Sequence, residues 1–549
     1  EDTAVAPEHL HEYVERFQAI FAARGLKAGF YGHCSVGCLH IRPFLDLSRP
    51  DQVEMMLEVE SEVVDLVAEF DGVNSSEHGD GRIRSPFSPR IFGDELYGAM
   101  RSVKRLFDPE GVLNPGVMVD AEPLPIGIRD AEYPQPKPLV THFQFPEGSM
   151  HAAADRCQRI GACRKTHAGV MCPSYMATRE EEHATRGRAN ALVKALSEPD
   201  PGAALGDERL YEILDLCLEC KACKSECPLS VDMATLKSEF LSHHNAIHGT
   251  PLRSRLFGSI RTLNKIGSAT APLSNAPLPR RLMEKITGID RRRPLPRFER
   301  ETLIRWAGKR ARRSPPSRGE VVFLADSFTT FTEPGVGRAA VELLDAAGYD
   351  VRLESGGCCG RASISKGLLD DAKAKAEALS ERLAGAATIT SVEPSCLLTL
   401  REEHVQLIGD RGIAARTKLV EELLVEAIDD GALRLQDLGP RRILFHGHCH
   451  QKALAGTAST VALLQRIPGA EVVELDAGCC GMAGSFGFEA EHYDLSMRIG
   501  GMRLFPAVRQ EPAATLIAAT GVSCRQQIAH GTGRPARHPV QLVREALID

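Results

Sequence analysis

Four cysteines are grouped in the stretch CLECKACKSECP, where they lie three, three and four residues apart and a proline follows the last. In loops with this spacing the first three thiolates, here Cys217, Cys220 and Cys223, bind one cubane iron–sulfur cluster, and the fourth, Cys227, binds its neighbour. A structural zinc site also needs four ligands, but it rarely has this spacing. The stretch therefore predicts at least one 4Fe-4S cluster.

The neighbouring cluster needs a second loop, which DRCQRIGACRKTHAGVMCPSY supplies in part. Cys157, Cys163 and Cys172 occupy the first, third and fourth cysteine positions of the pattern, whereas the second position holds Ile160. Because the fourth ligands are exchanged, the loops define two sets of thiolates. The sets are Cys172, Cys217, Cys220 and Cys223, and Cys157, Cys163 and Cys227. The incomplete set leaves three alternatives open: another ligand such as His167, a cluster of three irons, or no cluster.

A further group of cysteines belongs to an internal repeat. The strand-like runs VVFLADSF and RILFHGHC each lead to a GCCG sequence, and from Phe323 or Leu444 the first cysteine is 35 residues away in both cases. The second unit has four cysteines, and the first has three because the position matching Cys449 holds Phe328. These cysteines are Cys449, Cys479, Cys480 and Cys524, and Cys358, Cys359 and Cys396. Since adjacent cysteines are too constrained to form an ordinary disulfide with each other, we expect a metal or cluster in the second unit. Buried packing cysteines are the alternative in the first unit.

Histidines are clustered near the start of the chain, in GHCSVGCLH and SSEHGDGRIR. His33, His40 and Glu77 offer two imidazoles and a carboxylate, a set that leaves a position open for substrate on a divalent ion. On an unbroken strand, residues 33 and 40 would point to opposite faces, so a bend at Gly37 must bring them together. Taken alone, such histidines are more often hydrogen-bonded loop residues than ligands.

Several domains must position these residues, because 549 residues exceed what one hydrophobic core usually organises. The composition, 43% hydrophobic and 25% charged, is that of a globular protein, and the net charge of −7 does not indicate a nucleic-acid partner. No apolar run of about 18 residues and no leader sequence is apparent, so we expect a cytoplasmic protein with reduced cysteines. Because the chain begins with Glu1, we expect a longer polypeptide upstream.

Hydrophobic periodicity, proline and charge divide the chain into six segments. They are 1–120, 121–149, 150–250, 251–318, 319–438 and 439–549. The first segment predicts helices near 8–24 and 51–70 and a turn-rich stretch at 28–42, and the second is a proline-rich connector. The third carries helices between cysteines, and in the last two alternating strands and helices predict parallel α/β units.

The fourth segment is a basic helical linker. Between Arg280 and Arg318 it has 14 Lys or Arg against 4 Asp or Glu. Such a run is usually a solvated face, and docking on an acidic partner or on a membrane surface is the alternative.

Taken together, the motifs resemble known families. H-x-S-x-G-x-L-H, E-H-G-D-G-x-x-R and FDPEGVLNPG resemble the C-terminal catalytic half of the FAD-linked oxidases related to vanillyl-alcohol oxidase, over residues 1–120. The ordered pattern GACRK, GVMCPSY, TRGRAN and CLECKACKSECP, followed by paired Cys-Cys-Gly units, resembles the glycolate-oxidase iron–sulfur subunit. The whole chain is similar to the C-terminal part of bacterial fused FAD/iron–sulfur D-2-hydroxyacid dehydrogenases, of the D-2-hydroxyglutarate dehydrogenase type.

The resemblance implies a multidomain α+β and α/β fold. Its parts are an FAD-linked oxidase C-terminal domain, an α-helical ferredoxin domain, and duplicated Cys-Cys-Gly α/β domains of which the first is degenerate. The Gly-rich flavin-binding domain of these enzymes is not found in the sequence, so we expect FAD to be bound largely by a domain upstream in the same polypeptide or in another chain.

The resemblance also assigns roles within 1–120. The ligands of a divalent metal, for which we expect zinc, are His33, His40 and Glu77. The base that takes the proton of the substrate hydroxyl is His78. The remaining contacts are Arg84 and Arg42, which would hold a carboxylate, and Asn114, which would touch flavin or substrate. The Asp and Asn usual inside the His-to-His loop are replaced by Val36 and Cys38, which leaves the metal and its local hydrogen bonds uncertain.

The implied activity is oxidation of a D-2-hydroxyacid, with D-2-hydroxyglutarate the first candidate and D-lactate and glycolate the others. Electrons would leave through the 4Fe-4S clusters to a quinone or an electron carrier protein. We also expect a homo-oligomer, with peripheral contact to the inner membrane face as an option. The rival hypotheses are an electron-transfer subunit that docks a separate flavoprotein, and disulfide reduction as in heterodisulfide reductases.

Overall fold

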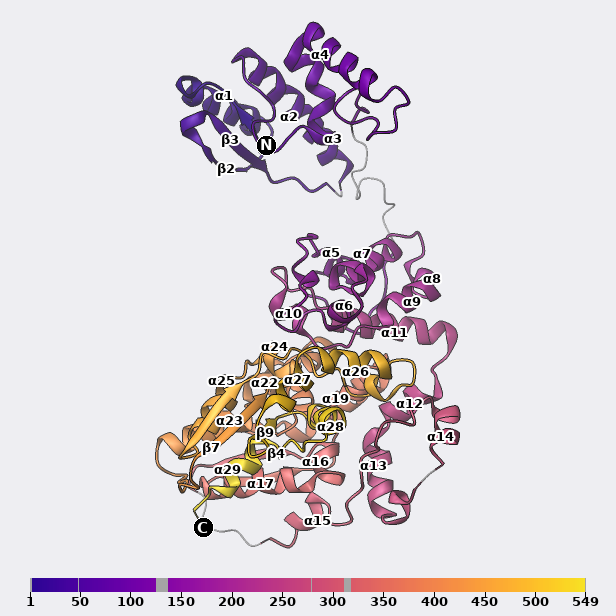
Figure 1. Ribbon diagram of the computed structural model, residues 1–549, viewed down its shortest axis with the longest axis vertical. Helices are drawn as coiled ribbons and strands as arrows, with labels where there is room; N and C mark the ends of the chain where they lie inside the picture. The colour runs from indigo at the N-terminus through magenta and orange to yellow at the C-terminus, as the bar shows by residue number, and fades with distance from the viewer. Residues whose placement is uncertain (1, 48, 125–136, 278, 311–316, 549) are drawn as a thin grey trace. The chain divides into compact units, whose positions relative to one another are not determined.

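The computed structural model forms two compact units, residues 1–135 and 136–549 (Figure 1). The division falls within the predicted connector, part of which lies outside the described residues. The structure describes 2–47, 49–124, 137–277, 279–310 and 317–548.

The first unit packs helices on a small antiparallel sheet. Strands β2 (Ala28–His33) and β3 (Cys38–Pro43) form a hairpin, and β1 (Thr3–Ala4) pairs with the other edge of β3. The turn-rich stretch predicted at 28–42 is therefore wrong in its larger part: Leu39 and Ile41 are buried in the core, and that burial stabilises the paired strands.

The two helices predicted in this unit are confirmed. They are α1 (Leu10–Ala22) and α2 (Pro50–Glu69), and α1 buries Tyr13, Phe17 and Phe21 at a spacing of four residues. Two more helices, α3 (Gly81–Arg84) and α4 (Ser88–Phe107), follow the sequence that carries Glu77 and His78.

The second unit begins with a helical domain around one core. That core holds both large apolar side chains, such as Leu192 and Phe240, and the thiols of seven cysteines, five of which belong to this domain. The helices are α5 (Met150–Asp155), α6 (Pro173–Thr178), α7 (Thr185–Leu196), α8 (Pro201–Ala204), α9 (Glu208–Asp215), α10 (Ala222–Glu226) and α11 (Met233–His248). The linker that follows is helical as predicted. Its helices are α12 (Leu252–Gly258), α13 (Ile260–Ala269), α14 (Arg280–Thr287) and α15 (Leu303–Ala307).

Each Cys-Cys-Gly repeat is built on a three-stranded parallel sheet, as predicted. The strand orders are β5-β4-β6 and β8-β7-β9, so the two units have the same topology. The strands are β4 (Glu320–Leu324), β5 (Asp350–Glu354), β6 (Ile389–Thr390), β7 (Arg441–His446), β8 (Ala470–Glu474) and β9 (Leu516–Ala519). The sequence pattern missed the edge strands β5 and β8, in which charged residues interrupt the apolar run.

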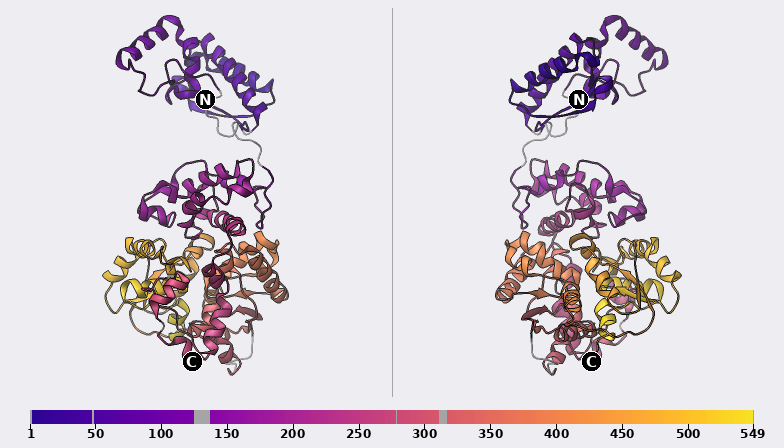
Figure 2. Two further views of the ribbon diagram at one scale, coloured as in Figure 1. Left: turned by 90° about the vertical axis from the view of Figure 1, so that its right-hand side faces the viewer. Right: turned by 90° about the vertical axis from the view of Figure 1, so that its left-hand side faces the viewer.

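Helices cover both sheets and join the repeats. Those of the first are α16 (Ser327–Phe331), α17 (Pro334–Ala346), α18 (Arg361–Ile364), α19 (Leu369–Leu383), α20 (Pro394–Arg401), α21 (Glu403–Ile408), α22 (Arg411–Arg416) and α23 (Val420–Asp429). Those of the second are α24 (Cys449–Leu454), α25 (Ala458–Gln465), α26 (Tyr493–Met502), α27 (Leu504–Gln510), α28 (Val522–Thr532) and α29 (Pro539–Glu545). Helix α17 packs on α29 and α23 on α25, so one hydrophobic core extends through both repeats, which lie side by side in Figure 2.

We predict that the two repeats unfold together. Phe323 on β4 and Phe445 on β7 are both fully buried in the shared core, so each change to Ala costs about 4 kcal/mol through the cavity it leaves. In calorimetry, Phe323→Ala and Phe445→Ala should each lower the midpoint temperature of the same unfolding transition, and by similar amounts. Two separate transitions, each affected by only one variant, would contradict a common core.

Candidate active site and thiol clusters

The β2–β3 hairpin brings the predicted histidines onto one face. Residue 33 pairs with Cys38 and residue 31 with His40, so His33 and His40 share a face, with ring centroids 6.0 Å apart. The chain reverses at Gly37, which has a φ of 75° and whose Cβ would lie 1.7 Å from the carbonyl oxygen of Val5. The required bend is present, and only glycine fits it.

Three imidazoles surround one carboxylate on this face. Glu77 Oε1 lies 2.8 Å from His40 Nε2, 3.6 Å from His33 Nε2 and 3.8 Å from His78 Nε2. The rings of His40 and His78 stack, with centroids 4.7 Å apart. Residues separated by up to 45 positions in sequence therefore offer their donor atoms to one small volume.

Sequence reasoning missed Asp2, which holds the loop that carries Glu77 and His78. Its fully buried carboxylate accepts hydrogen bonds from the Ser75 and Ser76 hydroxyls and from the backbone N–H groups of residues 76, 77 and 78. Burial raises the pKa of Asp2, but these hydrogen bonds, from Ser76 foremost, outweigh burial and lower the pKa overall. Asp2 is thus a buried anion that fixes the loop.

The residues fit a divalent ion. His40 is almost fully buried, and its Nδ1 has no hydrogen-bond partner within the described residues, although Asp2 Oδ1 lies 3.8 Å away. Two or three imidazoles with one carboxylate are the donors of catalytic zinc and related ions. The residues whose ligand atoms all lie within 4.8 Å of one another are Asp2, His40, Glu77 and His78. This group includes the predicted base His78 and not the predicted ligand His33, whose Nε2 lies 3.6 Å from Glu77.

The predicted substrate-binding arginines lie at different places. Arg42 is exposed on β3, on the face that carries His40, and its guanidinium lies 5.3 Å from the ring centroid of Tyr31, which itself packs against His40. Arg84, on α3, donates a hydrogen bond of 2.6 Å to the carbonyl of Gly79. Asn114 is exposed in a loop after α4, with a φ of 51°.

Cys38 replaces an expected amide beside the histidines. Its buried thiol accepts a hydrogen bond from the Ser76 hydroxyl at 2.9 Å and lies 3.7 Å from His40 Nε2. Val36 is exposed in the turn. A soft sulfur atom therefore lies beside His40 where an amide was expected.

In the second unit, the complete set of four thiols is gathered in one buried core. The four are Cys172, Cys217, Cys220 and Cys223. Burial raises the pKa of Cys217 and Cys223, and the charge of Cys172 adds to this rise in both, so these thiols lie close together. The fully buried Arg188 donates to the Cys172 sulfur at 3.5 Å. The thiolates thus need metal ions and cations nearby to be stable.

The incomplete set is gathered as well. Cys157, Cys163 and Cys227 line one small cavity together with Ile160, which holds the missing position. His167 is exposed, does not line this cavity, and contacts Thr166 through its Nδ1. The structure therefore does not bring the suggested substitute ligand to the three thiols.

In the second repeat, four buried thiols form a connected group. They are Cys449, Cys479, Cys480 and Cys524. Hydrogen bonds from Cys479 and Cys524 lower the pKa of Cys480 against the effect of burial, and His446 acts in the same direction. A hydrogen bond from Cys479 likewise lowers the pKa of Cys449. The pKa values of the other two thiols, Cys479 and Cys524, are raised, first by their hydrogen bonds to Cys449 and Cys480. The group thus divides into two thiols that favour the thiolate and two that donate to them.

The first repeat gathers Cys358, Cys359 and Cys396 in the same way, since neighbouring thiols are prominent causes of the pKa shifts of all three. Phe328 stands at the start of α16, where the second repeat has Cys449 at the start of α24. Sequence reasoning did not single out Asp326 in this repeat. Its buried carboxylate caps α16, and its charge raises the pKa of Cys396. All sixteen cysteines of the chain are free.

Comparison with known families divides the chain in the same order as its sites. Residues 1–118 match the family described as FAD linked oxidases, C-terminal domain, and residues 153–231 match the 4Fe-4S dicluster domain. The family described as cysteine-rich domain matches twice, at 324–401 and 443–529.

Similar proteins combine these parts. A D-2-hydroxyglutarate dehydrogenase of Escherichia coli (strain K12) is 29% identical over 100% of this chain and 58% of its own length. The glycolate oxidase iron-sulfur subunit of the same strain is 23% identical over 71% of this chain and 93% of its own. Lactate utilization protein A of Geobacillus thermodenitrificans is 31% identical over 30% of this chain and 72% of its own. The chain spans a little over half the length of the D-2-hydroxyglutarate dehydrogenases it matches.

We predict that a fourth cysteine completes the incomplete set. Ile160→Cys adds a thiol to the cavity formed around Cys157, Cys163 and Cys227, so iron per chain should rise, and the paramagnetic signal of a further four-iron cluster should be seen. Gln158→Cys, which lines the same cavity outside the motif position, is the matched control. Equal iron in the two variants and the unmodified chain would contradict the prediction.

Proposed function

Because the chain belongs to the FAD-linked oxidases that are fused to iron–sulfur domains, we propose that it is the substrate and electron-relay part of a D-2-hydroxyacid dehydrogenase. The first candidate substrate is D-2-hydroxyglutarate, with D-lactate and glycolate as the others. The observation that carries the proposal is the convergence of His33, His40 and His78 on Glu77 in a chain that also gathers two sets of thiols.

In this proposal His78 takes the proton of the substrate hydroxyl through Nε2. Its side chain is about two-fifths exposed, so substrate can reach it, while stacking on His40 fixes its orientation. The loop bonded to Asp2 holds its backbone in place. Arg42 offers an exposed guanidinium on the same face for a carboxylate, and Arg84 serves the second carboxylate of a dicarboxylic substrate.

The cofactors fit these residues by type. His33, His40 and Glu77 would hold a divalent ion, with zinc proposed. When bound, the ion would polarise the hydroxyl, FAD would accept the hydride, and the clusters would carry single electrons away.

An apolar face on the first unit supports a flavin-binding partner domain. Four apolar side chains on α4 are between 56% and 76% exposed, namely Leu96, Val103, Leu106 and Phe107. A contiguous apolar patch of this kind usually marks an interaction surface. We propose that the FAD-binding domain, in the same polypeptide or in another chain, covers this face.

The electron acceptor in this proposal is a quinone or an electron carrier protein, and the protein is a homo-oligomer that contacts the inner membrane face peripherally. The basic linker supports the membrane contact by its charge. None of the helices that the structure describes is long and apolar enough to cross a bilayer.

An electron-transfer subunit remains the second candidate, because the same α4 face could dock a separate flavoprotein. The two differ in what His78 does. In the first, it acts on substrate, and in the second the imidazoles only shape a docking surface.

We predict that His78→Ala in protein that includes the flavin-binding domain lowers dye reduction by D-2-hydroxyglutarate about 100-fold or more, since a general base contributes on this order. Cluster absorbance should be retained. His11→Ala, an exposed change on α1, is the control and should leave turnover unchanged. Equal turnover in both variants would favour the electron-transfer subunit.

A further inference from the structure

The second unit contains a cavity of about 980 Å³ whose interior has no role in the function proposed above. It lies among linker helices α12 to α14, the helical domain and both repeats. Cysteine thiols of both Cys-Cys-Gly repeats line it. They are Cys358, Cys359, Cys396 and Cys449, and Cys217 of the CLECKAC stretch lines it as well. A molecule in this cavity is thus next to the groups that would hold the electron carriers.

Its wall combines apolar side chains with many polar and charged ones. Leu241, Leu256, Phe257, Ile260 and Phe328 supply apolar surface. The volume suits a small organic molecule, whereas a folded carrier protein could not enter. Of the two acceptors proposed above, the cavity can enclose only the small one.

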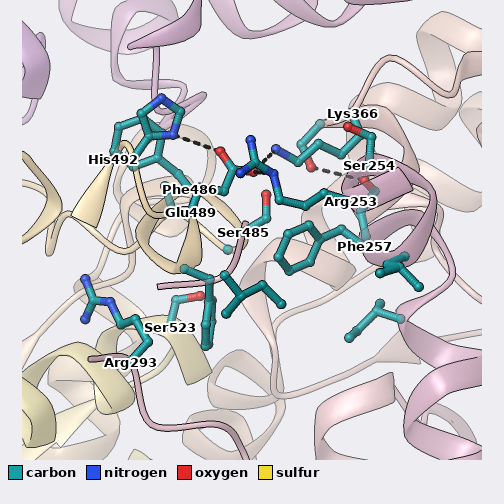
Figure 3. A pocket seen from close by; sticks show the side chains of 18 of the residues that line it. Arg253, Ser254, Phe257, Arg293, Lys366, Ser485, Phe486, Glu489, His492 and Ser523 are labelled. Atoms are coloured by element: carbon teal, nitrogen blue, oxygen red, sulfur yellow. Dashed lines mark hydrogen bonds and ion pairs between the residues drawn. The ribbon is translucent and has the colours of Figure 1, made fainter. Parts of the chain in front are cut away.

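Polar groups meet at one side of the cavity (Figure 3). Glu489 bonds both Lys366 and His492, and His492 also lies 2.7 Å from Asp215. The hydroxyls of Ser254 and Ser485 line the same region and can donate to a carbonyl oxygen. Such a site can hold an apolar ring through its carbonyl groups and exchange protons with it.

The linker carries exposed apolar side chains, some of which line the cavity. Leu263 and Leu295 both line the cavity and are more than a third exposed. On α14, Leu282 and Ile286 are 56% and 61% exposed, and they lie beside exposed Arg281 and Lys285. Apolar side chains flanked by cations fit the headgroup region of an anionic lipid surface.

We propose that this cavity binds a quinone, which enters from an anionic lipid surface contacted by α14. The proposal rests on the proposed function for the source of electrons. The hydroxyacid loses two electrons and two protons as its C–H and O–H bonds become a C=O bond, and the quinone gains two electrons and two protons as its carbonyl oxygens become hydroxyls. No other oxidant is required.

Binding is tested on the chain as it is, without hydroxyacid, by calorimetric titration with decyl-ubiquinone. Ser254→Phe fills the cavity and should weaken binding at least tenfold. Arg255→Phe is the matched control, because residue 255 is the exposed neighbour on α12 and does not line the cavity. The proposal would be overturned if decyl-ubiquinone did not bind to the unmodified chain, or if it bound equally well to Ser254→Phe and Arg255→Phe.

The lipid route is tested by co-sedimentation with vesicles that contain phosphatidylglycerol. Binding should be lost in Leu282→Ser/Ile286→Ser and weakened by salt, because both apolar insertion and charge contribute. Vesicle binding that is unchanged in the double variant, or absent in the unmodified chain, would overturn entry from lipid at α14.

A turnover experiment separates this inference from the function it rests on. In protein with the flavin-binding domain, Ser254→Phe should lower the ratio of quinone reduction to dye reduction at least tenfold. If D-2-hydroxyglutarate reduces neither acceptor while decyl-ubiquinone still binds in the cavity, the proposed dehydrogenase function fails and the binding site stands. If the dye is reduced and decyl-ubiquinone does not bind, the site fails alone.

Discussion

Buried sulfur that must carry negative charge is the constraint on which the second unit depends. A loop with three thiolates is stable inside a protein only when cations and hydrogen-bond donors compensate for lost water. Lys237 donates to the Cys217 carbonyl at 2.8 Å, and Lys221, also buried, pairs with Glu403 of the first repeat at 2.6 Å. Arg361 pairs with Glu219 at 2.7 Å. The charges that allow the cysteine loop to be buried therefore also fasten it to the first repeat.

The same loop is tied to the second repeat through its backbone. His450 Nε2 lies 2.8 Å from the carbonyl of Glu219, and after burial itself the charge of Cys449 is the next cause that raises the pKa of Cys220. A loop held by both repeats therefore has its thiols near those of the second repeat. Such closeness suits electron transfer, which requires short distances between carriers. The position of these thiols is thus a consequence of the charge pairing rather than of the cysteine spacing.

The sequence allowed prediction where chemistry is local. The cysteine spacing indicated which thiols gather, and the His-x6-His spacing required a bend at Gly37, because both depend on residues close together in the chain. Contacts between distant segments could not be predicted. Asp2 reaches the loop of residues 75–78 only after β1 pairs with β3, and Arg361 meets Glu219 only when repeat and helical domain pack. The stretch 28–42 was misjudged because glycines at 29, 32 and 37 resemble turn residues, although two of them lie in paired strands.

The difference between the two repeats follows from what one position does in each. In the second repeat, the start of α24 presents Cys449, which joins the thiol group. In the first repeat, the start of α16 presents Phe328, which lines the large cavity. Because the backbone at both positions begins a helix after the central strand, the exchange of sulfur for a ring changes chemistry without changing fold. In the first repeat, Phe328 therefore forms part of the apolar wall of the cavity. Cys449, at the matching position of the second repeat, lines the same cavity with a thiol.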